Sequence, residues 1–270
     1  MSDCTHDCSN CSEKDCGSRI EKEKQNEHSN IKKMYAVVSG KGGVGKSMVT
    51  SMLSVATARR GFKVGVLDAD ITGPSMGKEF GFEGQTQGCE YGIIPMETVT
   101  GIKVISINML LDKPSDPVVW RGPVIAGAVK QFYTDVYWGD VDFMYVDMPP
   151  GTGDVPLTVF QSLPIDGIIV VTSPQDLVTM IVEKAVKMAN MMNVPIVGIV
   201  QNMSYFECPN CHEKHFIFGK GKVEQVAKQY DIKNVASLPI SEDLAKMSDS
   251  GNMEWWEGKD LDVLVDAITK

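Results

Sequence analysis

The chain has 270 residues, 43% of them hydrophobic, and a formal net charge of −9 at pH 7. Nonspecific nucleic-acid affinity comes largely from clustered Lys and Arg, so this acidic balance argues against DNA or RNA as a partner. No run approaches the ~18 to 20 apolar residues that cross a bilayer, and the polar start has no leader pattern, so we expect a cytoplasmic protein without a membrane partner.

The first 32 residues are polar and charged, and a segment of this composition buries too little apolar surface to offset its ordering entropy. We therefore expect residues 1–32 to form a flexible, cysteine-rich arm. In a reducing cytoplasm, clustered cysteines point to metal or redox chemistry rather than to disulfides. The arm carries four of the chain's seven cysteines, namely Cys4, Cys8, Cys11 and Cys16.

We expect residues 33–270 to form one folded domain, because short runs of β-branched residues alternate there with stretches of helical period. The expected fold class is α/β, with a doubly wound, mostly parallel sheet of seven to eight strands flanked by helices. The predicted strands are 35–38, 63–67, 102–107, 143–146, 167–171, 196–201 and a weaker one at 235–238. The predicted helices are 47–60, 123–136, 177–192, 223–229 and 261–268.

A glycine-rich segment follows the first predicted strand and opens the first predicted helix. Its spacing matches G-x-x-x-x-G-K-[ST], in which glycines let backbone N–H groups surround phosphate oxygens. In such a loop Lys46 reaches the β- and γ-phosphates, and the Ser47 hydroxyl ligates Mg²⁺. The sequence therefore predicts an MgATP site formed by Gly40, Lys41, Gly42, Gly43, Val44, Gly45, Lys46 and Ser47.

Two carboxylates follow predicted strands at the edge where open α/β sheets bind ligands. Asp70 comes after the second predicted strand, and Asp147 comes directly after the fourth. Asp147 is suited to holding a Mg²⁺-bound water, and the glycine-hinged loop 149–154 is suited to a switch that responds to the γ-phosphate. Asp68 fits a cap or strand-end carboxylate about as well as a catalytic group.

Cys208 and Cys211 form a CxxC pair within the irregular segment 203–221. Two thiolates can share a metal or a cluster, but they leave its ligand set incomplete. A two-fold homodimer would add an identical pair and so give four thiolates. The neighbouring His212 and His215 keep zinc as an alternative, although their spacing leaves little chain to wrap a metal, and a structural zinc knuckle is the simplest interpretation.

The arm supplies four thiolates on its own, which is enough for one [4Fe–4S] cluster or one zinc ion without a partner chain. A metal-scavenging tail and an unstructured redox tail are the other interpretations of this spacing.

The segment GKGGVGKS, with its second lysine at Lys41, resembles the deviant Walker A motif of the dimeric ATPases that include MinD, the ParA partition proteins and the nitrogenase iron protein. A narrower resemblance is to the Mrp/ApbC family of iron–sulfur carrier ATPases, and it runs from about Met34 to the C-terminus. It lies in the segments DADITGPS, VWRGP, DMPPGTGD, TSPQ, GIVQNMSYFECPNCHEKHFIFG and SLPI. Thr72 and Met148 depart from residues that the family often has, and neither replaces a group with a proposed chemical role.

This resemblance implies a role for several residues. Lys41 would cross a dimer interface to the partner's ATP, much as an arginine finger does, and Asp70 would orient the attacking water. Asp147 and Ser47 would hold Mg²⁺, and Asn202 would contact the adenine edge. The CxxC pairs of a homodimer would hold a bridging [4Fe–4S] cluster. Eukaryotic relatives also carry an N-terminal cluster motif, with longer cysteine spacing than in this arm.

We therefore expect a slow ATPase that carries a [4Fe–4S] cluster and transfers it to apo iron–sulfur proteins. One alternative is a positioning switch of the MinD or ParA kind, whose marker would be a basic amphipathic C-terminal helix, whereas this C-terminus is acidic. The other is a zinc-stabilised interaction protein with vestigial ATP turnover.

Overall fold

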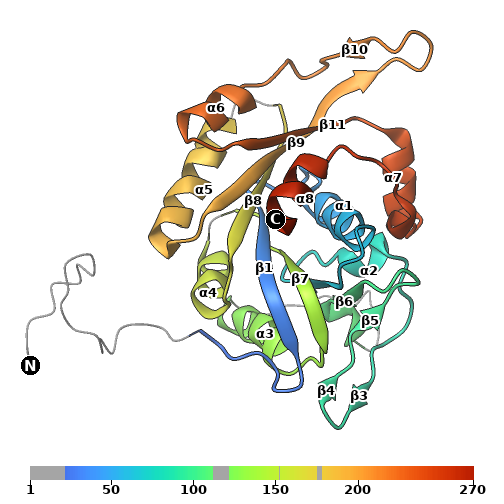
Figure 1. Cartoon of the computed structure of the whole chain (residues 1–270), viewed down its shortest axis with the longest axis vertical. Coiled ribbons are helices and arrows are strands. Elements are labelled where there is room, and N and C mark those ends of the chain that lie inside the picture. Colours follow the sequence, from blue (N-terminus) through green and yellow to red (C-terminus); the bar gives the residue numbers. More distant parts are fainter. Residues whose placement is uncertain (1–21, 112–121, 152, 175–177) are drawn as a thin grey trace, which may run out of the picture.

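The computed structural model describes residues 22–111, 122–151, 153–174 and 178–270. Within them a nine-stranded sheet runs in the order β10-β9-β8-β1-β7-β2-β6-β5, and β11 also pairs with β9 (Figure 1). Seven of its strands are parallel: β1 (Asn30–Ser39), β2 (Val64–Asp68), β6 (Lys103–Ile105), β7 (Asp140–Asp147), β8 (Gly167–Thr172), β9 (Ile196–Glu207) and β11 (Asn234–Pro239). The expected α/β fold class is confirmed.

Two short strands pair antiparallel at the borders of this sheet, β5 (Met96–Glu97) with β6 and β10 (Lys214–His215) with β9. A separate two-stranded hairpin consists of β3 (Gly88–Cys89) and β4 (Gly92–Ile93). The chain passes from β1 outward to β2 and β6, and then returns to β7, β8, β9 and β11. Its winding direction reverses around β1, which is where doubly wound sheets form their ligand crevice.

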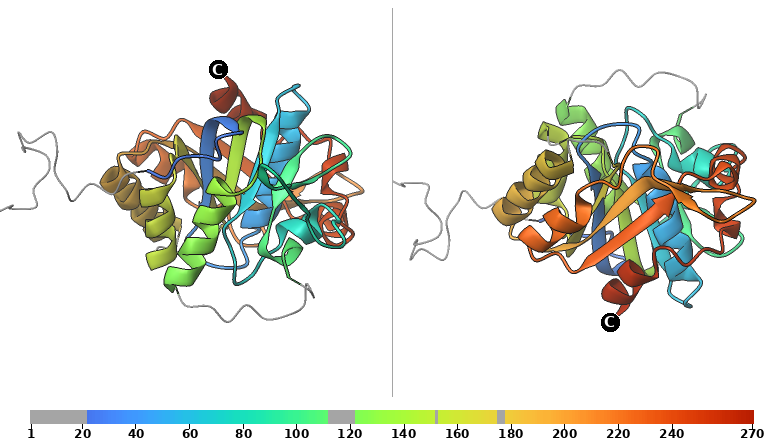
Figure 2. Two further views of the ribbon diagram at one scale, coloured as in Figure 1. Left: turned by 90° about the horizontal axis from the view of Figure 1, so that it is seen from below. Right: turned by 90° about the horizontal axis from the view of Figure 1, so that it is seen from above.

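Helices cover both faces of the sheet (Figure 2). One face carries α1 (Lys46–Ala58), α8 (Asp262–Thr269) and, towards one border, α2 (Met76–Glu79) and α7 (Glu242–Asp249). The other carries α3 (Gly122–Thr134), α4 (Asp154–Ser162), α5 (Val178–Met192) and α6 (Val223–Gln229). Two short 3-10 helices complete the described elements, η2 (Ile107–Met109) and η3 (Met253–Trp255). None of the described helices is long and apolar enough to cross a membrane.

Strand β1 shows why the sheet needs a helix layer on each face. Met34 and Val38 pack into the core under α3, α4 and α5, whereas Tyr35 and Val37 pack into the core under α1 and α8. Successive side chains of a strand point to opposite faces, so a strand that is buried on both faces reads as a continuous apolar run. This is the pattern that predicted the parallel sheet.

The structure corrects two expected boundaries. Strand β1 begins at Asn30, and the backbone N–H of Glu23 donates to the Ser162 carbonyl at 2.8 Å, so the arm boundary expected at residue 32 falls inside the folded domain. The segment 203–221 is not irregular throughout, because β9 continues to Glu207 and pairs with β10. The arm cysteines Cys4, Cys8, Cys11 and Cys16 lie outside the described residues.

The contact between α2 and α7 depends on two glycines whose backbones meet. Gly81 has a φ of 67° and Gly251 a φ of 70°, and a Cβ added to Gly251 would lie 2.3 Å from the Gly81 Cα. Lys78 also pairs with Asp249 across this junction, at 2.7 Å. The contact fixes α7 beside the segment that follows β2.

We predict that Gly251→Ala lowers the free energy of unfolding by ~2 kcal/mol or more beyond the effect of Gly84→Ala. Gly84 is the matched control, because its φ is 85° but a Cβ there would meet nothing within 4 Å. Urea denaturation of both variants measures the difference. Equal losses would mean that the two backbones do not meet.

Candidate functional site

The glycine loop lies between the carboxyl end of β1 and the first turn of α1. Gly43 and Gly45 both have a φ of 77°, a left-handed conformation that favours glycine. A Cβ on Gly45 would lie 2.3 Å from the Nδ2 atom of Asn202, and this Nδ2 donates to the Val44 carbonyl at 2.9 Å. The loop is therefore held against β9 at Asn202, and position 45 must stay free of a side chain.

Asp147 ends β7 and is fully buried beneath the loop. Its Oδ2 lies 2.6 Å from the Lys46 Nζ and accepts a 2.6 Å hydrogen bond from the Ser47 hydroxyl. Its Oδ1 accepts a 2.7 Å hydrogen bond from the Thr50 hydroxyl. Sequence analysis had identified Lys46, Ser47 and Asp147, but it missed Thr50. The sequence could have indicated Thr50, because a residue four positions after Lys46 in a helix lies on the same face as Lys46.

Two further carboxyls follow β2, and they differ in their surroundings. Asp68 is completely buried and accepts hydrogen bonds from the Ser106 hydroxyl at 2.9 Å and from the Met76 N–H at 3.2 Å. Burial, and then the neighbouring Asp147 charge, raise the pKa of Asp68. The hydrogen bond from the Met76 N–H, at the start of α2, agrees with a helix-capping role for Asp68, which was one of the two roles that the sequence allowed.

Asp70 is near the opening of the site rather than beneath it. Its Oδ1 accepts hydrogen bonds from the Thr72 hydroxyl and the Gly73 N–H, both at 3.2 Å. Burial raises the pKa of Asp70 above its ordinary value, although the Lys46 charge opposes this shift. A carboxylate with this environment is a stronger proton acceptor than an exposed aspartate.

A cavity of about 440 Å³ opens above these residues. Its lining brings together most of the glycine loop, including Lys41, with Asp70 and residues of α2 and α7. The sequence did not predict that residues of α2 and α7 line this cavity. Residues that line the cavity from that side are Ser75, Glu79, Ala245, Ser248 and Asp249.

Glu79 is a buried carboxyl in this wall, with only 6% of its surface exposed. Its Oε1 accepts a 2.9 Å hydrogen bond from the Ser248 hydroxyl, whereas its Oε2 is buried without a hydrogen-bond partner. Burial raises the pKa of Glu79 to about 7. No local sequence motif marks this residue, because its environment is created by α7, far along the chain.

The CxxC pair lies on the hairpin formed by β9 and β10. The Cys208 N–H donates to the Glu213 carbonyl at 3.0 Å, and the His212 N–H donates back to the Cys208 carbonyl at 2.9 Å. Both cysteines are free, Cys208 half-buried and Cys211 exposed. Hydrogen bonds from the backbone N–H groups of Cys211 and Asn210 lower the pKa of Cys208, which favours the thiolate that binds metals.

The histidines do not join the cysteines in a metal site within one chain. The Nδ1 atom of His212 lies 3.1 Å from the Glu207 Oε1. In the part of the chain that the structure describes, no group of three or more His, Cys, Asp or Glu side chains is arranged to hold a metal ion. One copy of the hairpin therefore offers two thiols and an open ligand set.

The parallel sheet, the glycine loop and the buried Lys46–Asp147 pair define this chain as a P-loop nucleoside triphosphatase that acts on ATP. The model of the NUBPL iron-transfer P-loop NTPase family matches residues 30–268, and the chain belongs to this family.

Individual relatives agree with this membership. The chain is 42% identical over 265 residues to an iron–sulfur cluster carrier protein of Clostridium perfringens, which covers 92% of this chain and 93% of the relative. A nucleotide-binding protein of Archaeoglobus fulgidus, solved in complex with ADP, superposes with a TM-score of 0.78 at 45% identity, over 84% of this chain and 90% of that one. The septum site-determining protein MinD of Pyrococcus horikoshii shares the fold, with a TM-score of 0.57 at 18% identity over 87% and 94% of the two chains.

The raised pKa of Glu79 predicts a specific pH dependence of stability. The folded protein keeps this proton up to about pH 7, whereas a carboxyl with the ordinary value of 4.5 loses it earlier in the unfolded chain. Between these values the folded state binds more protons, so this group's contribution to stability decreases as pH rises. Glu79→Gln cannot ionise, and its stability relative to the wild type should improve by up to ~3 kcal/mol between pH 4 and pH 8.

Urea denaturation at several pH values measures this difference. Glu83→Gln removes an exposed carboxylate nearby and serves as the control for a change in surface charge. A stability difference between Glu79→Gln and the wild type that is the same at all pH values would contradict the buried-carboxyl interpretation.

Proposed function

We propose that this chain is an ATP-hydrolysing carrier of iron–sulfur clusters that holds a [4Fe–4S] cluster between two copies and transfers it to apoproteins. The observation that carries the proposal is the position of the CxxC hairpin. It continues β9, which runs parallel to β8 and, through it, to β1. Parallel strands end at one edge of a sheet, so the thiols and the phosphate loop share an edge. The family membership and the carrier relatives support the same function.

The nucleotide's phosphates would bind at the glycine loop, from Gly40 to Ser47. The Lys46 Nζ lies 2.6 Å from the buried Asp147 carboxylate. We propose that this ammonium turns to the β- and γ-phosphates when ATP binds. Asn202 would contact the adenine edge with the second hydrogen of its Nδ2 atom, because the first is donated to the Val44 carbonyl.

Ser47 and Asp147 are suited to Mg²⁺. The Ser47 Oγ and the Asp147 Oδ2 lie 2.6 Å apart, and both are oxygen donors of the kind that Mg²⁺ prefers. Bound there, Mg²⁺ would neutralise charge on the phosphates and take the place of Lys46 beside Asp147. The donor set therefore fits the ion.

Hydrolysis requires a water in line with the γ-phosphorus and a group to orient it. Asp70 lines the cavity, and its raised pKa suits a carboxylate that accepts a hydrogen bond from this water and takes up its proton as the phosphorus–oxygen bond to ADP breaks. Lys41, also in the cavity lining, would reach the ATP of a partner copy and stabilise charge on the transferring phosphoryl group.

The cluster is the cargo of this cycle. One hairpin supplies the thiolates of Cys208 and Cys211, and a two-fold homodimer supplies the same pair again, which gives the four thiolates of a [4Fe–4S] site. The lowered pKa of Cys208 favours the thiolate form that binds a cluster. Cys4, Cys8, Cys11 and Cys16 would hold a further cluster or a zinc ion in the arm.

The structure does not favour the positioning-switch alternative. Helix α8 has its Leu264, Val265 and Ile268 buried in the core. A membrane-binding amphipathic helix needs its apolar face free.

We predict that Lys46→Ala abolishes most ATP hydrolysis, because the loop loses the charge that binds the β- and γ-phosphates. Phosphate release measures the loss. Lys63→Ala is the matched control: Lys63 also pairs with an aspartate, Asp140 at 3.2 Å, but at the exposed start of β2. Normal turnover in Lys46→Ala would place the phosphate site elsewhere. Thermal unfolding of both variants separates loss of catalysis from loss of the fold.

We also predict that Cys208→Ser with Cys211→Ser removes the bridging cluster. The background is a full-length chain in which Cys4, Cys8, Cys11 and Cys16 are serine, so that the arm binds no metal. After anaerobic reconstitution, iron, sulfide and zinc are quantified and an absorption spectrum is recorded. Cys89→Ser, at an exposed free cysteine, is the control. Unchanged iron and sulfide in the double variant, or zinc in place of both in its parent, would contradict the cluster assignment.

A further inference from the structure

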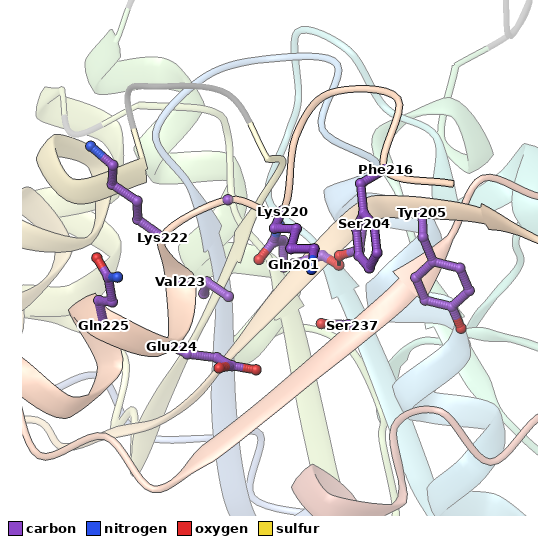
Figure 3. Close-up of a pocket in the computed structure, with 11 residues that line it drawn as sticks. Gln201, Ser204, Tyr205, Phe216, Lys220, Lys222, Val223, Glu224, Gln225 and Ser237 are labelled. Atoms are coloured by element: carbon purple, nitrogen blue, oxygen red, sulfur yellow. Dashed lines mark hydrogen bonds between the residues drawn. The ribbon is translucent and has the colours of Figure 1, made fainter. Parts of the chain in front are cut away.

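A second cavity, of about 250 Å³, lies between the cysteine hairpin and the start of α6 (Figure 3). We call it the hairpin pocket. Gln201, Ser204 and Ser237 contribute to it from β9 and β11, Phe216 and Lys220 from the returning side of the hairpin, and Glu224 from α6. Figure 3 shows Gln201, Ser204, Phe216 and Lys220 grouped together, with Ser237 and Glu224 below them.

Gln201 carries an unsatisfied hydrogen-bonding group in this pocket. Only 1% of the residue is exposed, and its Nε2 atom is buried without a hydrogen-bond partner. Gly221 closes over it with a φ of 70°, and a Cβ at Gly221 would lie 2.5 Å from this nitrogen. An unpaired buried donor is destabilising, so a ligand oxygen that accepted a hydrogen bond from the amide would remove this cost.

The hairpin pocket is separate from the nucleotide cavity. Gln201 and Asn202 are consecutive in β9, and the Asn202 amide binds the glycine loop at the Val44 carbonyl. Consecutive strand residues point to opposite faces, and the Gln201 side chain accordingly lines the pocket on the α6 side. No residue lines both cavities.

Two opposite charges border the pocket and neither is neutralised by an ion pair. Among the ion pairs of the described residues, neither Lys220 nor Glu224 takes part, and the Lys220 Nζ lies only over the Phe216 ring, 5.4 Å from its centroid. Lys222 and Gln225 extend away from the grouped side chains in Figure 3. The pocket therefore offers one ammonium, one carboxylate, one amide and an aromatic face.

These groups match a ligand that carries a carboxylate at one end and an ammonium at the other. A ligand carboxylate would accept from Lys220 and from the Gln201 amide, and a ligand ammonium would donate to Glu224 and the Ser237 hydroxyl. The Phe216 ring would cover a small side chain. About 250 Å³ is below the ~300 to 1,000 Å³ of pockets that hold drug-sized ligands, and this volume suits a single amino acid better than a nucleotide.

We propose that the hairpin pocket binds a free amino acid in its zwitterionic form, at a site independent of the nucleotide. Because the pocket joins β9, the hairpin's returning segment and α6, an occupant braces the hairpin that carries Cys208 and Cys211 against the domain. This proposal does not rest on the cluster-carrying function, because the pocket is defined only by the positions of its lining residues.

The test is a methyl NMR titration of the full-length protein, observed at Val223, which lines the pocket and is buried. The probes are L-alanine, L-serine and L-cysteine, with acetate, methylammonium and inorganic phosphate as partial ligands. We expect a saturable shift with at least one amino acid, at least tenfold weaker binding of each partial ligand, and no competition from ADP. The methyl signals of Val223 are assigned by comparison with the spectrum of Val223→Ile.

Substitutions locate the site. Gln201→Leu and Lys220→Met should each weaken amino-acid binding at least tenfold, while Lys222→Met, whose ammonium points away, should leave it unchanged. Lys220 is exposed, so its variant keeps the test valid if Gln201→Leu does not fold.

The proposal is overturned by any of four results. These are no saturable shift with the amino acids, acetate or phosphate binding as tightly as the amino acids, competition by ADP, or equal weakening by Lys220→Met and Lys222→Met. Equal weakening would indicate only a general charge effect.

Discussion

The buried carboxylate of Asp147 is the constraint on which the arrangement of the ligand edge depends. It is fully buried, and Lys46, Ser47 and Thr50 lie within 2.7 Å of it, so they supply the ion pair and the hydrogen bonds that a buried polar group needs. Removing one partner of a buried pair typically costs ~3–5 kcal/mol, because the other charge is left without compensation. The first turn of α1 is therefore held against the end of β7, and the glycine loop is held with it.

The same contacts extend beyond the glycine loop. In the proposed ATP complex, the Lys46 ammonium would be shared between Asp147 and the phosphates. Asp147 in turn contributes to the raised pKa of Asp68, whose backbone bonds hold the start of α2. The bond from the Ser248 hydroxyl to Glu79 then joins α2 to α7. These contacts join segments that lie far apart in the sequence.

Local patterns predicted the parts of the fold whose causes are local. The seven parallel strands follow from apolar runs buried on both faces, and the phosphate loop follows from glycine spacing between a strand and a helix. The start of β1 was missed because its residues Asn30–Lys33 are mostly exposed, so no apolar run marks them. Glu79 was missed because its burial comes from α7, at a sequence separation of 169 residues from Glu79 to Ser248. The hairpin pocket was missed because it joins β9, β11 and α6.

Strand β9 connects the two ends of the candidate site. Asn202 anchors it to the glycine loop, and the same strand continues to the residue before Cys208. Between these points Met203 has a φ of 56°, and the pairing of β9 with β11 shifts register beside it. A non-glycine residue in this conformation is held there by its surroundings rather than by its own preference. Val44 is therefore joined to β9 at the residue directly before Met203. A single strand thus connects the glycine loop with the CxxC pair.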